Sequence, residues 1–257
     1  MSATSVHRPP VFPHLWLLWF AGAHVLLAAL WWAWGWQAAI PVWLGSHGLL
    51  LWGTFRPGSP VLAPVLTRLP TQRREVWLTI DDGPSADTPA ILDLLDAHGA
   101  KATFFLVGAR AVAQPALVRD IVRRGHGIGN HSMSHPAAWF WALGPLRMRH
   151  EVERCQRALT DLTGRPPRWF RAVVGMSNPF VAAALKPHAL TRVAWSARGF
   201  DGVAADPEQV VARIDRDLAP GAIVLMHEGA PHGRNVAMLE LLLQRLAAKG
   251  YRTVVPD

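Results

Sequence analysis

The sequence predicts a barrel-like α/β domain that follows an apolar, membrane-type segment. After Glu75, short apolar runs alternate with amphipathic stretches. This alternation is typical of parallel strands joined by crossover helices. Before Glu75, two long stretches contain no Asp, Glu, Lys or Arg. Uncharged stretches of that length indicate helices that cross or enter a bilayer.

The first 74 residues divide into a tail (1–13), one or two transmembrane helices (14–55) and a linker rich in Pro and Arg (56–74). His14 to Trp34 is about 21 uncharged residues, long enough to cross a hydrocarbon layer of about 30 Å. Ala38 to Phe55 is interrupted by Pro and Gly, so it is either a second span or a re-entrant element. A cleaved secretory signal is the alternative, but the apolar run is long for one and no clear cleavage site precedes the second run.

The remaining residues, 75–257, are expected to form the α/β domain. Its strands are expected at Val76–Ile80, Ala102–Val107, Gly127–Gly129, Trp169–Arg171, Arg192–Trp195, Ala222–Met226 and Tyr251–Val255. Its helices are expected at Thr88–His98, Pro115–Arg124, Pro145–Thr163, Pro179–Lys186, Pro207–Leu218 and Val236–Lys249. Several of these helices begin with Pro, which is favoured in the first helical turn.

Carboxylate and imidazole side chains follow two of these strands. Asp81 and Asp82 come directly after the first strand, and His131 and His135 stand four residues apart after the third. One carboxylate and two imidazoles suit a divalent metal ion, and the second carboxylate is left to take a proton from water. On a helical turn, residues four apart share a face and converge on one ion. Either pair alone is more often a turn or a coincidence, but together they indicate a hydrolytic metal site.

Five ordered motifs from about Glu75 to the C-terminus resemble the polysaccharide deacetylases, also called carbohydrate esterase family four or the NodB homology family. The motifs are TIDDGP at 79–84, HSMSH at 131–135, FRAVVG at 170–175, WSARGFDG at 195–202 and IVLMHE at 223–228. The resemblance implies a distorted (β/α) barrel of about seven parallel strands. In the third motif Ala, Val and Val stand where the family usually has Pro and Tyr, and Glu228 stands where Asp is more usual.

The resemblance assigns the metal and the base. Asp82, His131 and His135 would hold a divalent ion, most simply zinc, although cobalt, nickel and manganese also suit this donor set. Asp81 would be the catalytic base. Arg171 would keep Asp81 ionised through charge pairing, whereas a simple structural salt bridge is the other interpretation of Arg171.

The resemblance also assigns the acid and the substrate contacts. His227 would be the general acid that protonates the departing amine, with Asp201 favouring its protonated form. A buried structural His is the alternative for His227. Leu225 would line the acetyl pocket, and the backbone N–H of Val174 would serve the oxyanion, a role that needs no particular side chain.

Trp139 and Trp141 follow the second motif and belong to no motif themselves. Aromatic faces stack on sugar rings, so we expect the two residues to form a substrate-facing platform. Packing beneath the loop is the alternative, because aromatic side chains bury large areas.

These features predict a membrane-anchored, metal-dependent hydrolase that removes an N-acetyl or other N-acyl group from an amino sugar in a polysaccharide or glycan. One alternative is a deacetylase or deformylase of a lipid-linked sugar at the cytoplasmic membrane face. Another is a catalytically inactive, carbohydrate-binding membrane protein, which the divergent third and fourth motifs would suit. The expected partners are a glycan or lipid-linked amino-sugar substrate and membrane lipids, and the sequence does not identify a protein partner.

Charge placement bears on location in a bacterial inner membrane. Five Arg and no acidic residue precede Glu75, and the connection at 35–37 between the two apolar stretches is uncharged. By the positive-inside rule two spans place the domain in the cytoplasm, whereas one span places it outside. Removing these five charges from the net +8 leaves +3 for the domain, so the basic balance does not indicate nucleic acid. The single Cys155 lies in an expected helix, where a buried apolar role is favoured.

Overall fold

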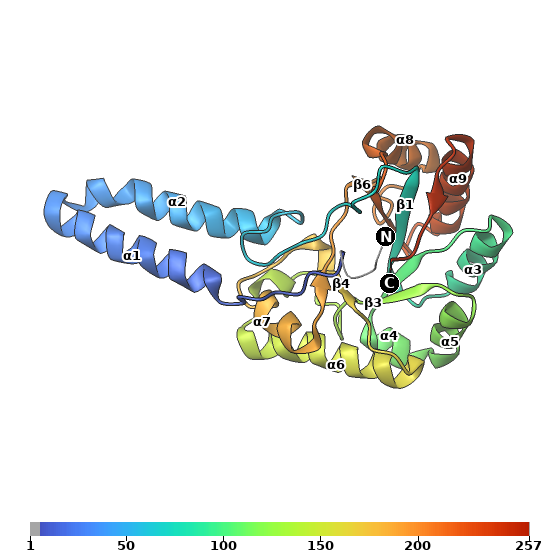
Figure 1. Cartoon of the computed structure of the whole chain (residues 1–257), viewed down its shortest axis with the longest axis horizontal. Coiled ribbons are helices and arrows are strands. Elements are labelled where there is room, and N and C mark those ends of the chain that lie inside the picture. Colours follow the sequence, from blue (N-terminus) through green and yellow to red (C-terminus); the bar gives the residue numbers. More distant parts are fainter. Residues whose placement is uncertain (1–5, 257) are drawn as a thin grey trace.

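The computed structural model describes residues 6–256, which form a curled parallel sheet covered by helices and a projecting pair of helices (Figure 1). The sheet has the strand order β5-β4-β3-β2-β1-β7-β6, and β8 pairs with β1 off this path. The predicted distorted (β/α) barrel of about seven parallel strands is therefore confirmed. Strand β6 was not predicted from the sequence, and β8, which was predicted, contributes only a short pairing to the base of β1.

The strands are short apart from β1. They comprise β1 (Glu75–Gly83), β2 (Thr103–Leu106), β3 (Gly127–Asn130), β4 (Trp169–Phe170), β5 (Thr191–Arg192), β6 (Ala197–Arg198), β7 (Ile223–His227) and β8 (Arg252–Thr253). The helices of the domain are α3 (Thr88–Ala97), α4 (Gly108–Ala113), α5 (Pro115–Arg123), α6 (Pro145–Thr163), α7 (Val181–Leu185), α8 (Pro207–Asp217) and α9 (Asn235–Ala248). All six helices predicted for the domain are present, and α4 is an additional one.

Strand β1 shows how the sequence positions a site inside this sheet. Successive side chains of a strand point to opposite faces. Val76, Leu78 and Ile80 belong to the main hydrophobic core formed with helices such as α3 and α9. Trp77 belongs to a separate cluster with residues from β2, β4 and β7. Asp81 points to the same face of β1 as Trp77 and lies at the carboxyl end of the strand, where functional sites of such barrels gather.

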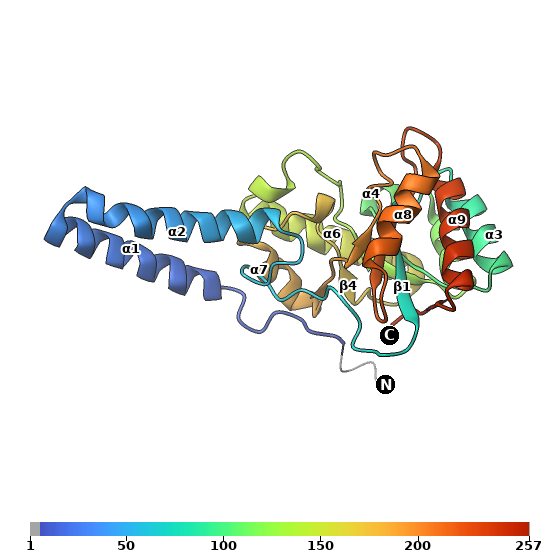
Figure 2. The ribbon, with the colours of Figure 1, turned by 90° about the horizontal axis from the view of Figure 1, so that it is seen from above.

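The two apolar stretches form two helices, α1 (Leu15–Trp34) and α2 (Trp36–Phe55), that pack side by side as a hairpin (Figures 1 and 2). Within the described residues, α1 is the one helix long and apolar enough to cross a membrane, and none of its apolar span is buried. Helix α2 is equally long and less apolar. It continues through Pro41 without a break, so a re-entrant loop does not form in this structure.

The Pro- and Arg-rich segment 56–74 packs against the barrel. Leu62, Ala63 and Leu69 are buried. The N–H of Leu66 donates to the Arg192 carbonyl (2.9 Å), and the N–H of Leu69 donates to Gly221 (2.7 Å). Leu66 therefore lies beside the chain at the end of β5, and Leu69 lies beside the start of β7. The segment therefore helps to close the barrel while it carries the chain from the hairpin to β1.

Candidate active site

Four strands bring the predicted residues together. In the β1–β7 pairing Asp81 stands directly opposite His227, and in the β3–β4 pairing Asn130 stands opposite Phe170. His131 and Arg171 are the next residues along the chain from that second pair. Parallel strands end at one edge of a sheet, so the residues predicted as base, acid and metal ligand converge there with Arg171 from motifs far apart in sequence.

Arg171 and Asp81 form a buried ion pair. Arg171 Nη1 lies 2.7 Å from Asp81 Oδ1, and the two side chains are 1% and 4% exposed. The remaining guanidinium donors reach Thr79 Oγ1 at 2.7 Å and the Ala194 carbonyl at 3.1 Å. The Cζ atom of Arg171 lies 4.2 Å from the centre of the Phe105 ring. The arginine is thus fully engaged, and one oxygen of Asp81, Oδ2, remains directed away from it.

Asp82, His131 and His135 form a cluster suited to a metal ion. One ligand atom from each lies within 4.8 Å of the other two. Asp82 Oδ1 is 2.9 Å from His135 Nε2 and 3.4 Å from His131 Nε2. Burial acts to raise the pKa of Asp82, but the two adjacent imidazoles hold it well below its usual range. Asp82 is therefore ionised, as a metal ligand must be.

The local hydrogen bonds fit a divalent ion between these three residues. Asp82 Oδ1 is buried and accepts no hydrogen bond of normal geometry, even though both imidazoles are close to it. His131 Nδ1 lies 2.9 Å from the Arg171 carbonyl and donates to it, which leaves Nε2 unprotonated and directed at the cluster. This is the usual arrangement of a metal-binding histidine. Its partner, Arg171, is the residue that also pairs with Asp81.

The two histidines converge through a loop and not through a helical turn. The expectation that their four-residue spacing reflects a helix is wrong, because residues 131–135 have no helical structure. Ser132 and His135 have positive φ angles of 68° and 52°. Asn130 fixes the loop, since its Oδ1 accepts from the Ser132 N–H and its Nδ2 donates to Val152 and Gln156 of α6.

His227 is clamped by Asp201. Asp201 Oδ1 lies 2.9 Å from His227 Nδ1, and Oδ2 accepts the backbone N–H of the same histidine at 2.5 Å. Burial would lower the pKa of His227, but the Asp201 carboxylate, helped by Asp81 and Asp82, outweighs burial and raises that pKa to about 9. With Nδ1 held by Asp201, Nε2 is the nitrogen that remains for the cleft.

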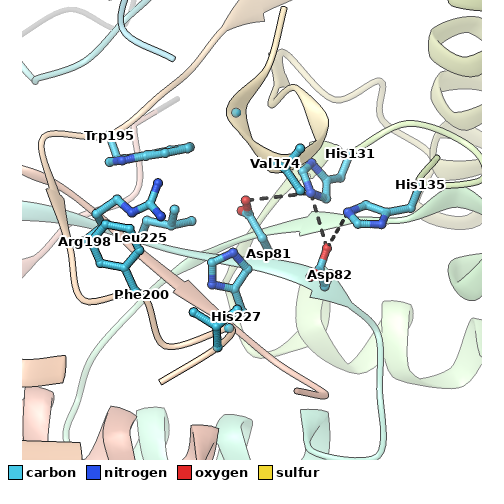
Figure 3. Close-up of a pocket in the computed structure, with 13 residues that line it drawn as sticks. Asp81, Asp82, His131, His135, Val174, Trp195, Arg198, Phe200, Leu225 and His227 are labelled. Carbon is cyan, nitrogen blue, oxygen red and sulfur yellow. Dashed lines mark ion pairs between the residues drawn. The ribbon is translucent and has the colours of Figure 1, made fainter. Parts of the chain in front are cut away.

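A cleft of about 240 Å³ opens over these groups (Figure 3). Val174 and Leu225 line it, as predicted. Val174 has a φ of 47°, which is unusual for a β-branched residue and directs this loop toward the metal ligands. Trp195, Arg198 and Phe200 form the wall opposite the two histidines (Figure 3). Sequence reasoning assigned no role to these three, although all lie in the loosely matched fourth motif.

Trp139 and Trp141 lie outside this cleft. Trp139 is 67% exposed, and neither residue is among those that line the cleft. The Trp141 ring packs 5.6 Å from that of Phe55, the last residue of α2. Trp141 therefore lies beside the end of the helical hairpin, and a contact of either tryptophan with substrate stays a prediction.

Glu228 supports β1 from outside the cleft. It is buried and accepts a hydrogen bond from Ser85 Oγ at 2.7 Å and another from Thr88. A side chain at Gly83 would place its Cβ 2.0 Å from Glu228 Oε1. The Glu228 side chain thus occupies the space that a side chain at Gly83 would need.

A model of the family "Polysaccharide deacetylase" matches residues 68–193. A chitooligosaccharide deacetylase of Bradyrhizobium sp. is 36% identical over 162 residues, which is 62% of this chain and 73% of the relative. The chain belongs to the polysaccharide deacetylase family.

Two further comparisons agree with membership of the polysaccharide deacetylase family. A peptidoglycan-N-acetylglucosamine deacetylase of Listeria monocytogenes is 33% identical over 200 residues, covering 77% of this chain but only 41% of the relative. The solved structure of a family 4 carbohydrate esterase from Streptomyces lividans, in complex with acetate, has a TM-score of 0.65 and 33% identity. It covers 71% of this chain and 93% of that one.

Replacing Arg171 with Met should destabilise the protein by about 3–5 kcal/mol, because Asp81 would be left buried and unpaired. Adding Asp81→Asn removes that charge, so the double variant should regain part of the loss. Chemical unfolding of the detergent-solubilised full chain would measure both. As a control, Arg157→Met breaks an exposed pair with Glu153 on α6 and should cost at most about 1 kcal/mol. A double variant no more stable than Arg171→Met would contradict the assigned charge pairing.

Proposed function

We propose that this protein is a divalent-metal-dependent hydrolase that removes an N-acetyl group from an amino sugar of a glycan. The observation that carries the proposal is the arrangement of two carboxylates around one cluster. Asp82 joins His131 and His135, while Asp81 stays outside that set and is held by Arg171. The relatives that are named as deacetylases of chitooligosaccharide and of peptidoglycan N-acetylglucosamine support the substrate class.

Each residue has a separate task in amide hydrolysis. A divalent ion held by Asp82, His131 and His135 would polarise the amide carbonyl and make a water molecule more acidic. Asp81 takes the proton of the attacking water, because Arg171 holds its carboxylate in place through Oδ1 and leaves Oδ2 for the water. His227 gives a proton to the amine as it leaves, since an unprotonated amine is a poor leaving group. Zinc suits the donor set best, and cobalt, nickel or manganese would also bind.

Two further cleft residues, Leu225 and Val174, would contact the acyl group. Leu225 lies on β7, two residues before His227, and lines the same cleft. Its apolar side chain would receive the methyl of the acetyl group. The backbone N–H of Val174 would donate to the oxyanion, because this strained loop holds Val174 over the metal ligands (Figure 3).

An inactive carbohydrate-binding protein is less well supported than an enzyme. The divergent third motif keeps Arg171, and the loosely matched fourth motif keeps Asp201. Both side chains are buried and hold catalytic groups, Asp81 and His227 respectively. A binding protein would need neither a clamped acid nor a buried base. The changes in these motifs therefore lie around the catalytic residues and do not remove them.

We also propose that the helical hairpin anchors the protein in a membrane with the domain on its cytoplasmic side. Each helix has 20 residues, which corresponds to about 30 Å. Large apolar side chains such as Leu18, Val25 and Trp32 are exposed along α1. Arg8 precedes α1 and Arg56 follows α2, whereas the connection at Gly35 is uncharged. This charge distribution supports a two-span topology by the positive-inside rule.

The activity predicts acetate release from an N-acetylated oligosaccharide such as chitotetraose. Asp81→Asn should reduce kcat by about 10²–10⁴-fold, as expected for loss of a general base. A chelator should abolish release, and added zinc should restore it. Asp161→Asn, an exposed change on α6, should have no effect. Unchanged acetate release by Asp81→Asn would show that the proposed mechanism is wrong.

The pH profile depends on the Asp201–His227 pair. His227 must be protonated to act as the acid, so activity should be lost as pH rises through its folded pKa of about 9. Asp201→Asn removes the charge that raises this pKa and should move the alkaline limb of kcat/KM toward about pH 6.5. Asp161→Asn again serves as the control. An alkaline limb that stays in place in Asp201→Asn would exclude His227 as the group that titrates there.

The topology predicts that a reporter fused after Asp257 is active only in its cytoplasmic form. The unfused protein should stay in the membrane fraction after an alkaline wash. Val25→Arg together with Leu26→Arg should release it, because a charge at the centre of a span costs about 2.5–3.5 kcal/mol. Val112→Arg, on α4 of the domain, should not. A reporter active outside the cell would instead indicate a single span.

A further inference from the structure

A second cleft of about 420 Å³ adjoins the catalytic cleft. The two share Trp195 and Arg198 as lining residues. The second cleft is lined in addition by Arg56, Pro57, Gly58, Thr67, Ser196 and Asp217. Pro57 packs against Gly175, a lining residue of the catalytic cleft, because a Cβ on Gly175 would be 2.8 Å from its Cγ atom. The segment that follows α2 therefore contacts the wall of the catalytic cleft, and Trp195 and Arg198 face both clefts.

Arg198 faces both clefts with an unused guanidinium group. Its Cζ lies 3.7 Å from the centre of the Phe200 ring and 5.2 Å from that of Trp195. Figure 3 shows it between these two rings, across the cleft from His131 and His135. Within residues 6–256 it forms no ion pair and no side-chain hydrogen bond. The rings hold its plane in position, which leaves its N–H groups for a ligand.

Arg56 places the other end of the second cleft at the helical hairpin. It caps α2, with its N–H bonded to the Trp52 carbonyl at 3.0 Å, and its guanidinium lies 5.2 Å from the Trp52 ring. The carbonyl of Thr54 accepts the N–H of Ser177 at 2.8 Å. Since Val174 lies just before Ser177, the last turn of α2 is joined directly to the wall of the catalytic cleft.

The charge of the second cleft favours an anion. Two arginines and one carboxylate, Asp217, line it. In the part of the chain that the structure describes, none of the three forms an ion pair with another. A guanidinium binds phosphate with a matching pair of N–H donors. A phosphate at this place would lie between an amino sugar at the metal cluster and the end of the apolar hairpin.

We propose that the substrate is an amino sugar joined through a phosphate to a membrane lipid, and that Arg198 and Arg56 bind this phosphate. The inference rests on the proposed deacetylase function and narrows its substrate. The sugar would reach the cluster of Asp82, His131 and His135 while the lipid stays beside α1 and α2. The path from the metal cluster past Arg198 to Arg56 is the feature that selects this class over a free polymer.

The test compares three N-acetylated substrates by acetate release from the full-length protein in vesicles. They are N-acetylglucosamine linked through phosphate to a polyprenyl chain, soluble N-acetylglucosamine 1-phosphate, and neutral chitotetraose. The lipid-linked substrate should give the highest kcat/KM. Arg198→Gln should reduce the ratio of kcat/KM for the lipid-linked substrate over chitotetraose by about 10–100-fold, the loss expected for a charged hydrogen bond. Arg56→Gln should reduce the same ratio.

Two arginines of similar surroundings serve as controls. Arg213 lies 5.8 Å from the same Phe200 ring but lines neither cleft. Arg68 belongs to the same segment as Arg56 and donates to the Pro220 carbonyl. Arg213→Gln and Arg68→Gln should leave the substrate ratio as it is. A ratio that changes equally in these variants would show a general loss of positive charge and overturn the assigned site.

The outcomes separate this inference from the proposed function. No acetate from any of the three substrates would contradict the deacetylase function itself. Acetate released best from chitotetraose by the wild-type protein would leave that function standing and overturn the phosphate site, whether or not the variants fold. Equal kcat/KM for the soluble and lipid-linked phosphates would show that phosphate is bound but that the lipid is not part of recognition, which overturns the lipid-linked class.

Discussion

The buried pair of Arg171 and Asp81 is the interaction on which the rest of the site depends. Burying two charges is costly unless both are paired and fully hydrogen-bonded. Arg171 meets this condition by reaching the end of β1 through Asp81 and Thr79, and the chain after β5 through Ala194. Its own carbonyl accepts from His131 Nδ1. One residue therefore fixes Asp81, the proposed base, and orients His131, a proposed metal ligand, so the separation of these two side chains follows from a single set of contacts.

Backbone strain is concentrated around this pair. Six non-glycine residues of the described chain have positive φ angles, and four of them, Asp82, His135, Val174 and Phe200, line the catalytic cleft. Each such conformation costs about 1–3 kcal/mol and persists only where the surroundings enforce it. Here the buried Asn130 network and the packed loop before Gly175 provide that constraint. The strain directs side chains from the ends of four strands at one point, an arrangement that regular strands and helices do not produce.

The sequence was informative where the signal was local and less so where tertiary contacts decide. The apolar run before Asp81 and the amphipathic pattern of α6 each predict an element directly, and the spaced motifs identify most of the site. Strand β6 has only two residues, Ala197 and Arg198, and exists because β7 pairs with it. The convergence of His131 and His135 could be predicted, but not its cause, because positive φ at Ser132 leaves no mark on residue type. The positions of Trp195 and Phe200 in the cleft wall were missed for a similar reason, since only the folded structure shows their rings packed on either side of Arg198.

Hydrogen bonds join the helical hairpin to the wall of the catalytic cleft. The N–H of Ser177 donates a hydrogen bond to the Thr54 carbonyl in the last turn of α2. Arg192, a buried residue of β5, donates to the Pro57 carbonyl at 2.7 Å. A helix held in a bilayer would therefore set the height and tilt of the cleft wall that contains Val174. In the proposed membrane topology, this attachment would hold one end of the cleft at a fixed distance from the lipid, whereas a flexible tether would leave the cleft free to face a distant polymer. These contacts would then restrict where the substrate can come from.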